Sequence, residues 1–341
     1  MLIVRASRTS DLDALYEMAE AAAIGLTTLP RDHDMLRAYL EDSKHAFEKK
    51  VSKPRDERYL LVMEDALSGE IVGCAGITGR VGGFEPHYTY DLSSETIASE
   101  SLAVSKVIET LHLSETHKGP SEIGTLFVRP ERRRHGGGRL MSLSRFLFMA
   151  VHPIRFAPLV IAEMRGRSNE EGQSPFWENI GRHFFDLNFA QADLLSASDK
   201  QFIADLMPRH PIYIPMLSPE AQGVIGQVHS ETEPALKLLR QEGFTFADAV
   251  DIFDAGPVLS VEREDIRSIK ESERGKFSEV LKTTSSSADF IIANPSIEFR
   301  AGLGSVQRLD NGAVALEQSL ALGLNLKLGD EVIFTPVRAT K

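Results

Sequence analysis

The stretch that decides the fold runs from Glu122 to Arg139 and reads EIGTLFVRPERRRHGGGR. Its first seven residues, through Val128, form an apolar run that predicts a strand, and the apolar pattern after Arg139 predicts a long helix. Between them stands Arg-x-x-Gly-x-Gly, formed by Arg133, Gly136 and Gly138. Free amides without crowding side chains at a helix N-terminus can wrap a pyrophosphate. The stretch therefore predicts a strand, a turn and a helix that bind a phosphate-bearing coenzyme.

Two commoner phosphate motifs do not fit this turn. No Gly-Lys-Ser/Thr follows the glycines, as a P-loop requires. A dinucleotide fingerprint needs Gly-x-Gly-x-x-Gly and an acidic residue roughly 20 positions further on, and this pattern is also missing. The coenzyme is therefore predicted to be neither ATP nor NAD.

Outward from this stretch, strands and helices alternate through most of the chain. Strands are predicted at residues 2–5, 59–63, 71–77, 158–164 and 244–253, and helices at 10–22, after Asp32 and at 235–241, with helix-like stretches at 174–182 and 198–206. Residues 80–120 have weaker periodicity and are predicted to be an insertion with a short helix near 101–111. Short apolar runs after Pro257 predict a small β-rich unit.

Composition limits the classes of function. The 341 residues suit two domains of roughly 100–200 residues each. The 38 Lys and Arg against 49 Asp and Glu give a net charge of −11, which argues against a nucleic-acid partner or an anionic membrane. Cys74 is the only cysteine, so neither an intrachain disulfide nor a multi-thiolate metal site is expected. We expect a cytoplasmic protein without signal peptide or membrane anchor.

The order strand, helix, helix, hairpin, strand, Arg-x-x-Gly-x-Gly, helix, strand resembles the GNAT superfamily of acyl-CoA N-acyltransferases from residue 1 to about 167. The resemblance implies an α/β (α+β) fold with a mixed, mainly antiparallel twisted sheet flanked by helices, plus a small C-terminal β-rich domain. It also implies that the strand before the glycines splays from the next one and holds the pantetheine arm. The implied coenzyme-binding residues are Leu126, Phe127, Val128, Arg133, Arg134, Gly136, Gly137, Gly138 and Arg139.

Further motifs narrow the resemblance to the arginine N-succinyltransferase family over about residues 1–260. They include GLTTLP at 25–30, EMRG at 163–166, SPFW at 174–177, GRHFF at 181–185, HPIY at 210–213, GQVH at 226–229 and DIFDAGP at 251–257. The implied division is an acyltransferase domain at 1–256, with an insertion at about 80–120 and an extension at 168–256, followed by a β-rich domain at 257–341.

This family implies transfer of a succinyl group from succinyl-CoA to the α-amino group of L-arginine in arginine catabolism. A free amine is itself the nucleophile once deprotonated, so direct transfer needs positioning and proton transfer but no protein nucleophile. The family places its proton donor at His229. Cys74 lies mid-strand in a predicted core, which favours packing over acyl transfer. Succinyl-CoA is a co-substrate, and no permanently bound cofactor or metal is implied.

The two substrates demand opposite kinds of recognition. Carboxylates suit the guanidinium of arginine, and cationic or hydroxyl donors suit the carboxylates. A loop between the first two helices usually lines the acceptor site in this fold. The substrate-binding candidates are Thr27, Thr28, His117, Glu163, Arg165, Ser174, Asp251 and Asp254, with Arg182 and His210 as further carboxylate-binding candidates.

Alternatives to this function remain open at this stage. Ornithine can replace arginine as the acceptor, and the chain can be a homo-oligomer or one subunit of a hetero-oligomeric enzyme. From a different class, it can be a regulatory subunit that binds acyl-CoA without turnover. The Arg-x-x-Gly-x-Gly pattern together with His229 favours an enzyme, because a sensor does not need the proton donor.

Overall fold

The computed structural model describes residues 1–22, 28–83, 85–133, 136–169, 172–196, 200–281 and 288–339. Through residue 163 its helices and strands are β1 (Leu2–Ala6), α1 (Leu12–Ala21), α2 (His33–Glu48), β2 (Arg58–Asp65), β3 (Ile71–Thr78), β4 (His87–Ser99), β5 (Val104–Thr116), β6 (Ser121–Val128), α3 (Pro130–Arg133), α4 (Gly137–Val151) and β7 (Leu159–Glu163). The predicted strands and helices of this part are thereby confirmed, apart from the insertion.

The rest of the described chain adds shorter elements. They are α5 (Pro175–Asn179), α6 (Phe189–Ser196), α7 (Gln201–Leu206), β8 (Ile212–Tyr213), α8 (Pro219–Gln222), α9 (Glu233–Gln241), β9 (Thr245–Val250) and β10 (Pro257–Glu262). The C-terminal elements are α10 (Arg267–Lys270), β11 (Glu273–Val280), β12 (Phe290–Ala293), β13 (Arg300–Gly304), β14 (Gln307–Arg308), β15 (Ala313–Leu316), α11 (Gln318–Gly323) and β16 (Glu331–Pro336).

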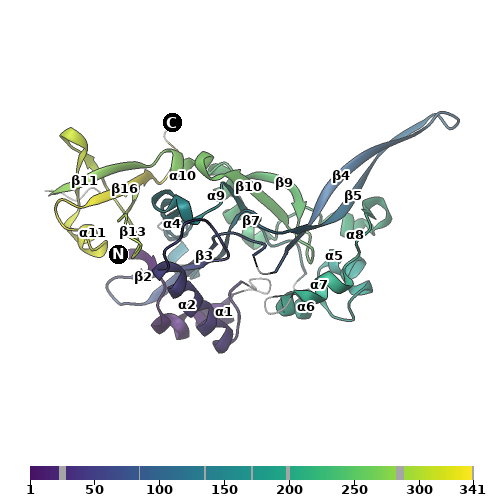
Figure 1. The fold of residues 1–341 in the computed structure, drawn as a ribbon, viewed down its shortest axis with the longest axis horizontal. Coiled ribbons are helices and arrows are strands. Elements are labelled where there is room, and N and C mark those ends of the chain that lie inside the picture. Colours follow the sequence, from purple (N-terminus) through teal and green to yellow (C-terminus); the bar gives the residue numbers. More distant parts are fainter. Residues whose placement is uncertain are drawn as a thin grey trace.

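All the described strands belong to one sheet, in the order β14-β15-β11-β16-β12-β13-β1-β2-β3-β6-β7-β10-β9-β4-β5-β8 (Figure 1). Two neighbouring pairs, β6 with β7 and β11 with β15, are parallel, and the other pairs are antiparallel. The predicted fold class, a mixed and mainly antiparallel sheet flanked by helices, is therefore confirmed.

Helices cover both faces of the central strands. Helix α4 packs on one face, where Leu143, Phe146 and Phe148 are fully buried in the largest apolar cluster. Helices α1 and α2 pack on the other face, with Leu15 and Leu36 in a separate cluster. Helix α2 begins after Asp32 because the Asp32 side chain accepts hydrogen bonds from the amides of residues 34 and 35. Alternate residues of β2 and β3 therefore contribute to two separate cores.

The predicted helix near 101–111 is wrong. Strands β4 and β5 form a long antiparallel hairpin, with Ser99 opposite Val104 next to its tip and His87 opposite Thr116 at its base. Val104, Val107, Ile108 and Leu111 fit helical spacing, but β-branched residues favour strands, and pairing with β4 satisfies the backbone hydrogen bonds. Figure 1 shows the outer part of this hairpin as an arm that projects away from the body.

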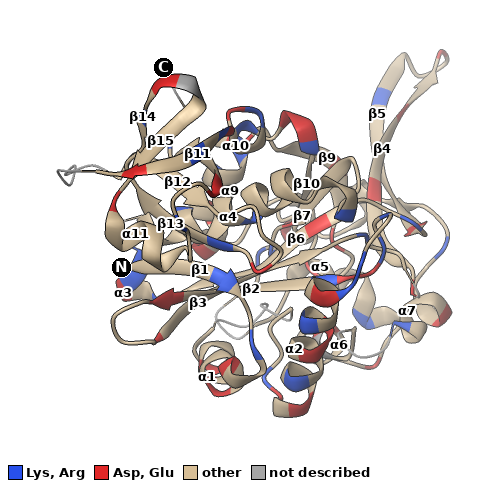
Figure 2. Cartoon of the chain, turned by 60° about the vertical axis from the view of Figure 1, so that its left-hand side comes forward, with Lys and Arg blue, Asp and Glu red and all other residues tan. Residues whose placement is uncertain are grey.

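The sheet continues across the predicted domain boundary at 257. Strand β10 begins at Pro257 and pairs with β7 and β9, and β13 pairs with β1. Acidic and basic residues are intermixed over the helices and strands (Figure 2). No helix of the described residues is long and apolar enough to cross a membrane. The division into domains 1–256 and 257–341 stays a prediction.

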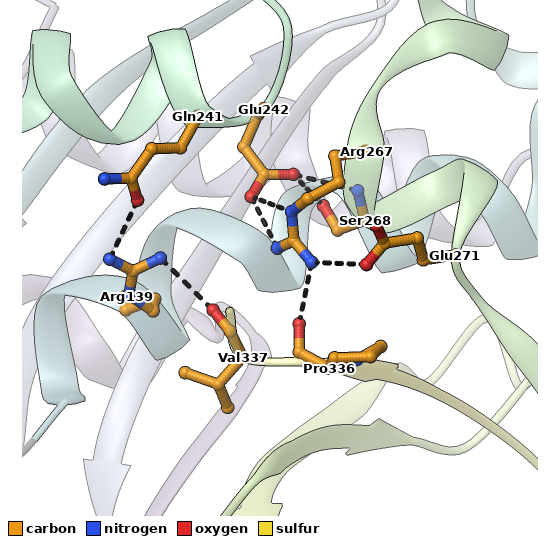
Figure 3. A network of polar contacts seen from close by, with 8 residues as sticks. All are labelled: Arg139, Gln241, Glu242, Arg267, Ser268, Glu271, Pro336 and Val337. Carbon is orange, nitrogen blue, oxygen red and sulfur yellow. Dashed lines mark hydrogen bonds and ion pairs between the residues drawn. The ribbon is translucent and has the colours of Figure 1, made fainter. Parts of the chain in front are cut away.

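A buried polar network joins α9 to the C-terminal strands (Figure 3). Glu242, at the end of α9, is fully buried, and its carboxylate accepts from Arg267 at 2.6 Å and from the amide of Ser268 at 2.9 Å. Arg267 also donates to the carboxylate of Glu271 at 2.9 Å and to the carbonyl of Pro336 at 3.1 Å. Because a buried charge must be paired, this network fixes α10 and the end of β16 against α9.

Candidate active site

Strands β6 and β7 pair for only two residues and then separate. Ser121 lies opposite Val160 and Glu122 opposite Ile161, and no further pair follows. Thr125 has a φ of +51°, and the pairing of β3 with β6 is irregular between Cys74 and Gly76. A residue with positive φ bends a strand out of regular pairing. Beyond Glu122, the edge of β6 that carries Leu126, Phe127 and Val128 therefore faces β7 without a strand partner.

The glycine turn follows this edge and opens helix α4. Gly136 is the N-cap residue, with φ of +88° and no side-chain cap, so the first amides of α4 keep free donors. A Cβ on Gly137 would lie 2.2 Å from the carbonyl oxygen of Arg132, whereas a Cβ on Gly138 would meet nothing within 4 Å. Gly137 is therefore required by the fold, while Gly138 leaves open space in front of the helix.

Two of the three arginines predicted to bind the coenzyme, Arg133 and Arg139, have protein partners. Arg133 donates to the carbonyl of Val128 at 2.8 Å, and its guanidinium lies over the ring of Phe127. Arg139 donates to the carbonyl of Val337 and to the side chain of Gln241, both at 3.1 Å (Figure 3). Arg134 lies outside the described residues. The coenzyme contacts of all three side chains stay predictions, and the geometry favours backbone amides as the phosphate ligands.

A cleft of about 770 Å³ opens on the face of the sheet that carries α1 and α2. Thr28 and Tyr39 line it on the helix side, and Gly124 and Thr125 line it on β6. Its lining carboxylates are Asp42, Asp56, Glu85, Glu122, Glu163, Asp193 and Asp251. Because Glu122 is the last residue of β6 paired with β7, the cleft and the gap between these strands meet at this residue.

Glu122, Glu163 and His87 form the charged centre of the cleft. His87 Nε2 lies 3.1 Å from Glu163 Oε1. Burial opposes the charge of both side chains, but their mutual attraction outweighs it, raising the pKa of His87 and lowering the pKa of Glu163. Burial and the negative charge of Glu163 raise the pKa of Glu122. Among the described residues, Glu122 has no hydrogen-bond partner for its carboxylate, so it is free to accept a proton or a cation.

Asp251 and Asp254 share one turn but differ in access. Asp251 lines the cleft, and its Oδ1 accepts from the amides of Phe253 at 2.7 Å and Asp254 at 2.9 Å. Burial, with the charge of Glu163, raises the pKa of Asp251 to about 6. Asp254 instead accepts from the amides of Gly166 and Gly256, and burial and Asp251 raise its pKa well above the usual range. Both carboxylates therefore support the turn, and of the two only Asp251 lines the cleft.

His229 lies beside the continuation of β7. Its backbone amide donates to the carbonyl of Arg165 at 2.9 Å, two residues after Glu163. Its Nδ1 accepts from the amide of Glu231 at 3.3 Å, which favours the tautomer with hydrogen on Nε2. Burial and the charge of Arg165 lower the pKa of His229, so the ring is neutral at neutral pH. Nε2 has no partner among the described residues and is free to donate.

Three of the other predicted site residues, Ser174, Arg165 and His117, do not line the cleft. Ser174 is buried as the N-cap of α5, where its Oγ accepts from the amide of Trp177 at 3.2 Å. The Arg165 guanidinium lies 3.3 Å from the carboxylate of Glu231. His117 is exposed and pairs with Glu115 at 3.1 Å. Thr28 lines the cleft, whereas Thr27 lies outside the described residues. The ligand roles of these residues stay predictions.

Sequence reasoning missed Glu122, His87 and Arg80 of the cleft. Glu122 was visible as the polar residue that begins the decisive apolar strand. His87 begins β4, a strand that was not predicted because residues 80–120 have weaker periodicity and were predicted to be an insertion with a short helix. Among the described residues, no group of three or more His, Cys, Asp or Glu side chains is arranged to hold a metal ion. The cleft is therefore built from acidic groups and hydrogen-bonding groups.

The parallel strand pair that separates above a glycine turn is the arrangement that the resemblance to the GNAT acyltransferases implied. The model of the family described as "Arginine N-succinyltransferase beta subunit" matches residues 2–268. The chain is 41% identical over 342 residues to the Arginine N-succinyltransferase subunit beta of Pseudomonas aeruginosa, covering 100% of this chain and 99% of that protein. The chain belongs to the arginine N-succinyltransferase family.

Two further relatives agree with this assignment. The Arginine N-succinyltransferase of Yersinia pseudotuberculosis serotype O:3 is 42% identical over 275 residues, covering 80% of this chain and 78% of that protein. The solved structure of arginine/ornithine succinyltransferase subunit AI from Pseudomonas aeruginosa superposes with a TM-score of 0.90. It is 34% identical in sequence, and the match covers 99% of both chains. The chain is therefore an acyltransferase, and its similarity to the solved Pseudomonas aeruginosa structure covers 99% of its length.

Proposed function

We propose that this chain transfers the succinyl group of succinyl-CoA directly to the α-amino group of L-arginine. The observation that carries the proposal is the meeting of the acidic cleft with the unpaired edge of β6 at Glu122. A cationic amine in the cleft would there face a thioester held along the strand. The amine nitrogen forms the new C–N bond and the C–S bond breaks. The ammonium form of the acceptor loses two protons on this route. The first passes to Glu122 before attack, and the second leaves the nitrogen as the thiolate departs and ends on the coenzyme sulfur.

The coenzyme is proposed to bind by backbone groups. The free edge formed by Leu126, Phe127 and Val128 would hydrogen-bond the pantetheine arm, as an added strand does. The uncapped amides of Gly137 and Gly138 would hold the pyrophosphate, because a helix N-terminus favours anions. Succinyl-CoA then acts as a co-substrate, with no permanently bound cofactor or metal in the reaction.

Glu122 is proposed to accept the proton of the incoming ammonium group. Its raised pKa and unpaired carboxylate suit a general base, because a carboxylate with a raised pKa holds a proton more strongly than an ordinary one. Glu163 and Asp251 contribute the negative potential that attracts the cationic acceptor, and Thr28 supplies a hydroxyl on the opposite wall. This arrangement supports a cationic amino acid as the acceptor.

His229 is proposed to act on the leaving group. Its Nε2–H can donate to the sulfur as negative charge develops there, and this donation assists departure of the thiolate. The lowered pKa keeps the ring neutral at neutral pH, and the bond from the amide of Glu231 holds its orientation. The proposal thus separates the acceptor of the amine proton, Glu122, from the donor to the sulfur, His229.

The chain is proposed to work as one subunit of an oligomer, formed with itself or with a homologous chain. The relative from Pseudomonas aeruginosa carries the name subunit beta, and the solved structure carries the name subunit AI. The β4–β5 arm supports the proposal because Ile97, Leu102 and Val107 on it are 50–74% exposed. An isolated two-stranded ribbon is only marginally stable in water. Light scattering of the chain and of a Leu102→Ser, Val107→Ser variant tests it, and equal masses for both would contradict a role of the arm.

One assay tests the activity. Purified chain is mixed with succinyl-CoA and L-arginine, and thiol release is followed with product mass, with ornithine and acetyl-CoA as alternative substrates. Succinylarginine as the main product supports the proposal. A preference for ornithine would change the acceptor but retain the reaction. Binding of succinyl-CoA without thiol release for any amine, with or without a homologous subunit, would favour a regulatory subunit instead.

A further inference from the structure

One cation on the wall of the cleft has no partner in the described part of the chain. Arg80 follows β3 and lines the cleft, half-buried. Its Nε is buried and makes no hydrogen bond with any described residue. A buried donor without an acceptor is unfavourable, since it has lost its water and gained nothing in return. A ligand oxygen that accepts a hydrogen bond from Arg80 Nε would therefore stabilise the protein.

The other two permanently charged cations that line the cleft differ in their surroundings from Arg80. Arg58 is paired with Asp42, and its guanidinium lies 4.7 Å from the ring centre of Tyr39. The charge of Lys200 favours the ionised forms of Glu122 and Glu163. Arg80 is left as the guanidinium that is available to a substrate among the described lining residues.

Arg80 lies close to the point where β6 and β7 separate. Thr78 pairs with Glu122 across β3 and β6, and Arg80 is two residues beyond Thr78. The amide of Val81 donates to the carbonyl of Pro120 at 2.9 Å, which holds this segment against the start of β6. Two residues of extended chain span roughly 7 Å, so Arg80 and Glu122 belong to the same wall. An amino acid carries its ammonium and carboxylate groups on one carbon and needs such a neighbouring pair.

We propose that Arg80 binds a substrate carboxylate, with the α-carboxylate of the amino-acid acceptor as its ligand. The planar guanidinium presents two parallel N–H donors that match the two oxygens of a carboxylate. This inference rests on the proposed function, because it assumes an amino acid in the cleft. The succinyl group of the donor also ends in a carboxylate, so the test must separate these two sources of the same chemistry.

Binding measurements separate the sources without requiring turnover. Calorimetry compares L-arginine with agmatine, which has the same amine and guanidinium but no carboxylate, and succinyl-CoA with acetyl-CoA. Arg80→Met is expected to weaken binding of arginine by about 10- to 100-fold, as loss of a charged hydrogen bond does, and to leave agmatine within about twofold. Arg80→Lys should recover part of the loss. Arg274→Met removes an exposed arginine of β11 as the matched control.

The outcomes decide the proposal. A loss confined to arginine places the acceptor carboxylate on Arg80, and a loss confined to succinyl-CoA keeps the carboxylate site but moves it to the donor. Equal losses for all four ligands, or no loss for any, overturn it. If Arg80→Met does not fold, as judged by its melting curve, Arg80→Gln replaces it. Wild-type chain that binds arginine but never releases thiol would overturn the proposed function, while the Arg80 comparison remains valid.

Discussion

His87 Nε2 lies 3.1 Å from Glu163 Oε1, which joins the base of β4 to the end of β7 in the centre of the acidic cleft. The two strands are separated by β10 and β9 in the sheet. His87 thereby places one titratable cation beside Glu163, with Glu122 and Asp251 lining the same cleft. The charge state of this group controls how strongly the cleft attracts a cation.

The first prediction concerns this pair. His87→Gln removes the cation that lowers the pKa of Glu163, so that pKa should rise. The acid limb of kcat/KM for the acceptor, measured against pH, should therefore move to higher pH. His45→Gln, which changes an exposed ring on α2, is the control. An unmoved acid limb would show that Glu163 does not govern acceptor binding.

Replacing Asp251 by asparagine should have opposite effects on the stability of the fold and on binding of the acceptor. Its pKa is raised to about 6, so the folded state holds a proton that the unfolded state loses near 3.8, and wild-type stability falls as pH rises through this window. Asp251→Asn retains an acceptor for the amides of Phe253 and Asp254. It should gain roughly 1–3 kcal/mol at pH 7.5 and nothing near pH 3.5, by urea unfolding.

The same Asp251→Asn change should raise KM for the acceptor, because one negative charge of the cleft is lost. In the wild type, KM should likewise rise as pH falls below about 6, where Asp251 takes up its proton. Asp34→Asn, at an exposed carboxylate paired with Arg37, serves as the control and should change neither quantity by much. A flat KM between pH 7.5 and 5 would disprove a role of the Asp251 charge in binding.

Neighbouring glycines should respond differently to alanine. Gly137→Ala places a Cβ 2.2 Å from the Arg132 carbonyl oxygen, so the melting temperature should fall. Gly138→Ala meets nothing within 4 Å, so the melting temperature should stay within about 2 °C of the wild type. If the pyrophosphate lies at this turn, Gly138→Ala should raise KM for the acyl-CoA several-fold. Wild-type kinetics in Gly138→Ala would place the pyrophosphate elsewhere.

His229→Ala should separate turnover from binding. A group that acts on the leaving sulfur is used in the transition state, so kcat should fall at least about 100-fold while the affinity for succinyl-CoA changes little. Stopped assays give kcat, and calorimetry gives the affinity. A variant with full turnover would assign the leaving-group role to another residue or to solvent.

The network of Figure 3 provides a matched pair of stability variants. Glu242 and Glu271 both bind Arg267, but Glu242 is fully buried and Glu271 is partly exposed. Glu242→Ala should cost about 3–5 kcal/mol, because it leaves a buried guanidinium without its main partner. Glu271→Ala should cost about 1 kcal/mol or less. Equal losses in urea unfolding would show that burial does not set the strength of these pairs.

Local sequence patterns predicted the helices and strands that are set by neighbouring residues, such as a cap or an apolar run. Asp32 caps α2, and the apolar run to Val128 followed by the glycine turn and α4 appears as expected. The β4–β5 hairpin was not predicted, because its strands are stabilised by pairing with each other rather than by a buried face. Coenzyme recognition by backbone amides also has a local signal, because it depends on consecutive residues around Gly136.

No local pattern in the sequence predicted the acceptor cleft. Its polar groups come from four strands or turns that are far apart in the chain, represented by His87, Glu122, Glu163 and Asp251. Glu163, Asp251 and Asp254 were predicted from motifs of the family, but the motifs did not show that Asp251 lines the cleft whereas Asp254 accepts from the amide of Gly166. Which carboxylate lines the cleft depends on contacts between segments that are far apart in the chain.

The sequence by itself determined the family, the strand–turn–helix of the coenzyme site and the acidic balance of the chain. These follow from neighbouring residues and from composition. Only the tertiary structure decided that β6 and β7 separate at Glu122 and that His87 meets Glu163. It also decided that Arg80 Nε has no hydrogen-bond partner among the described residues. The physical reason is that burial, strand register and distance between charges are properties of segments brought together by folding, and these properties set each pKa and each free hydrogen-bond donor.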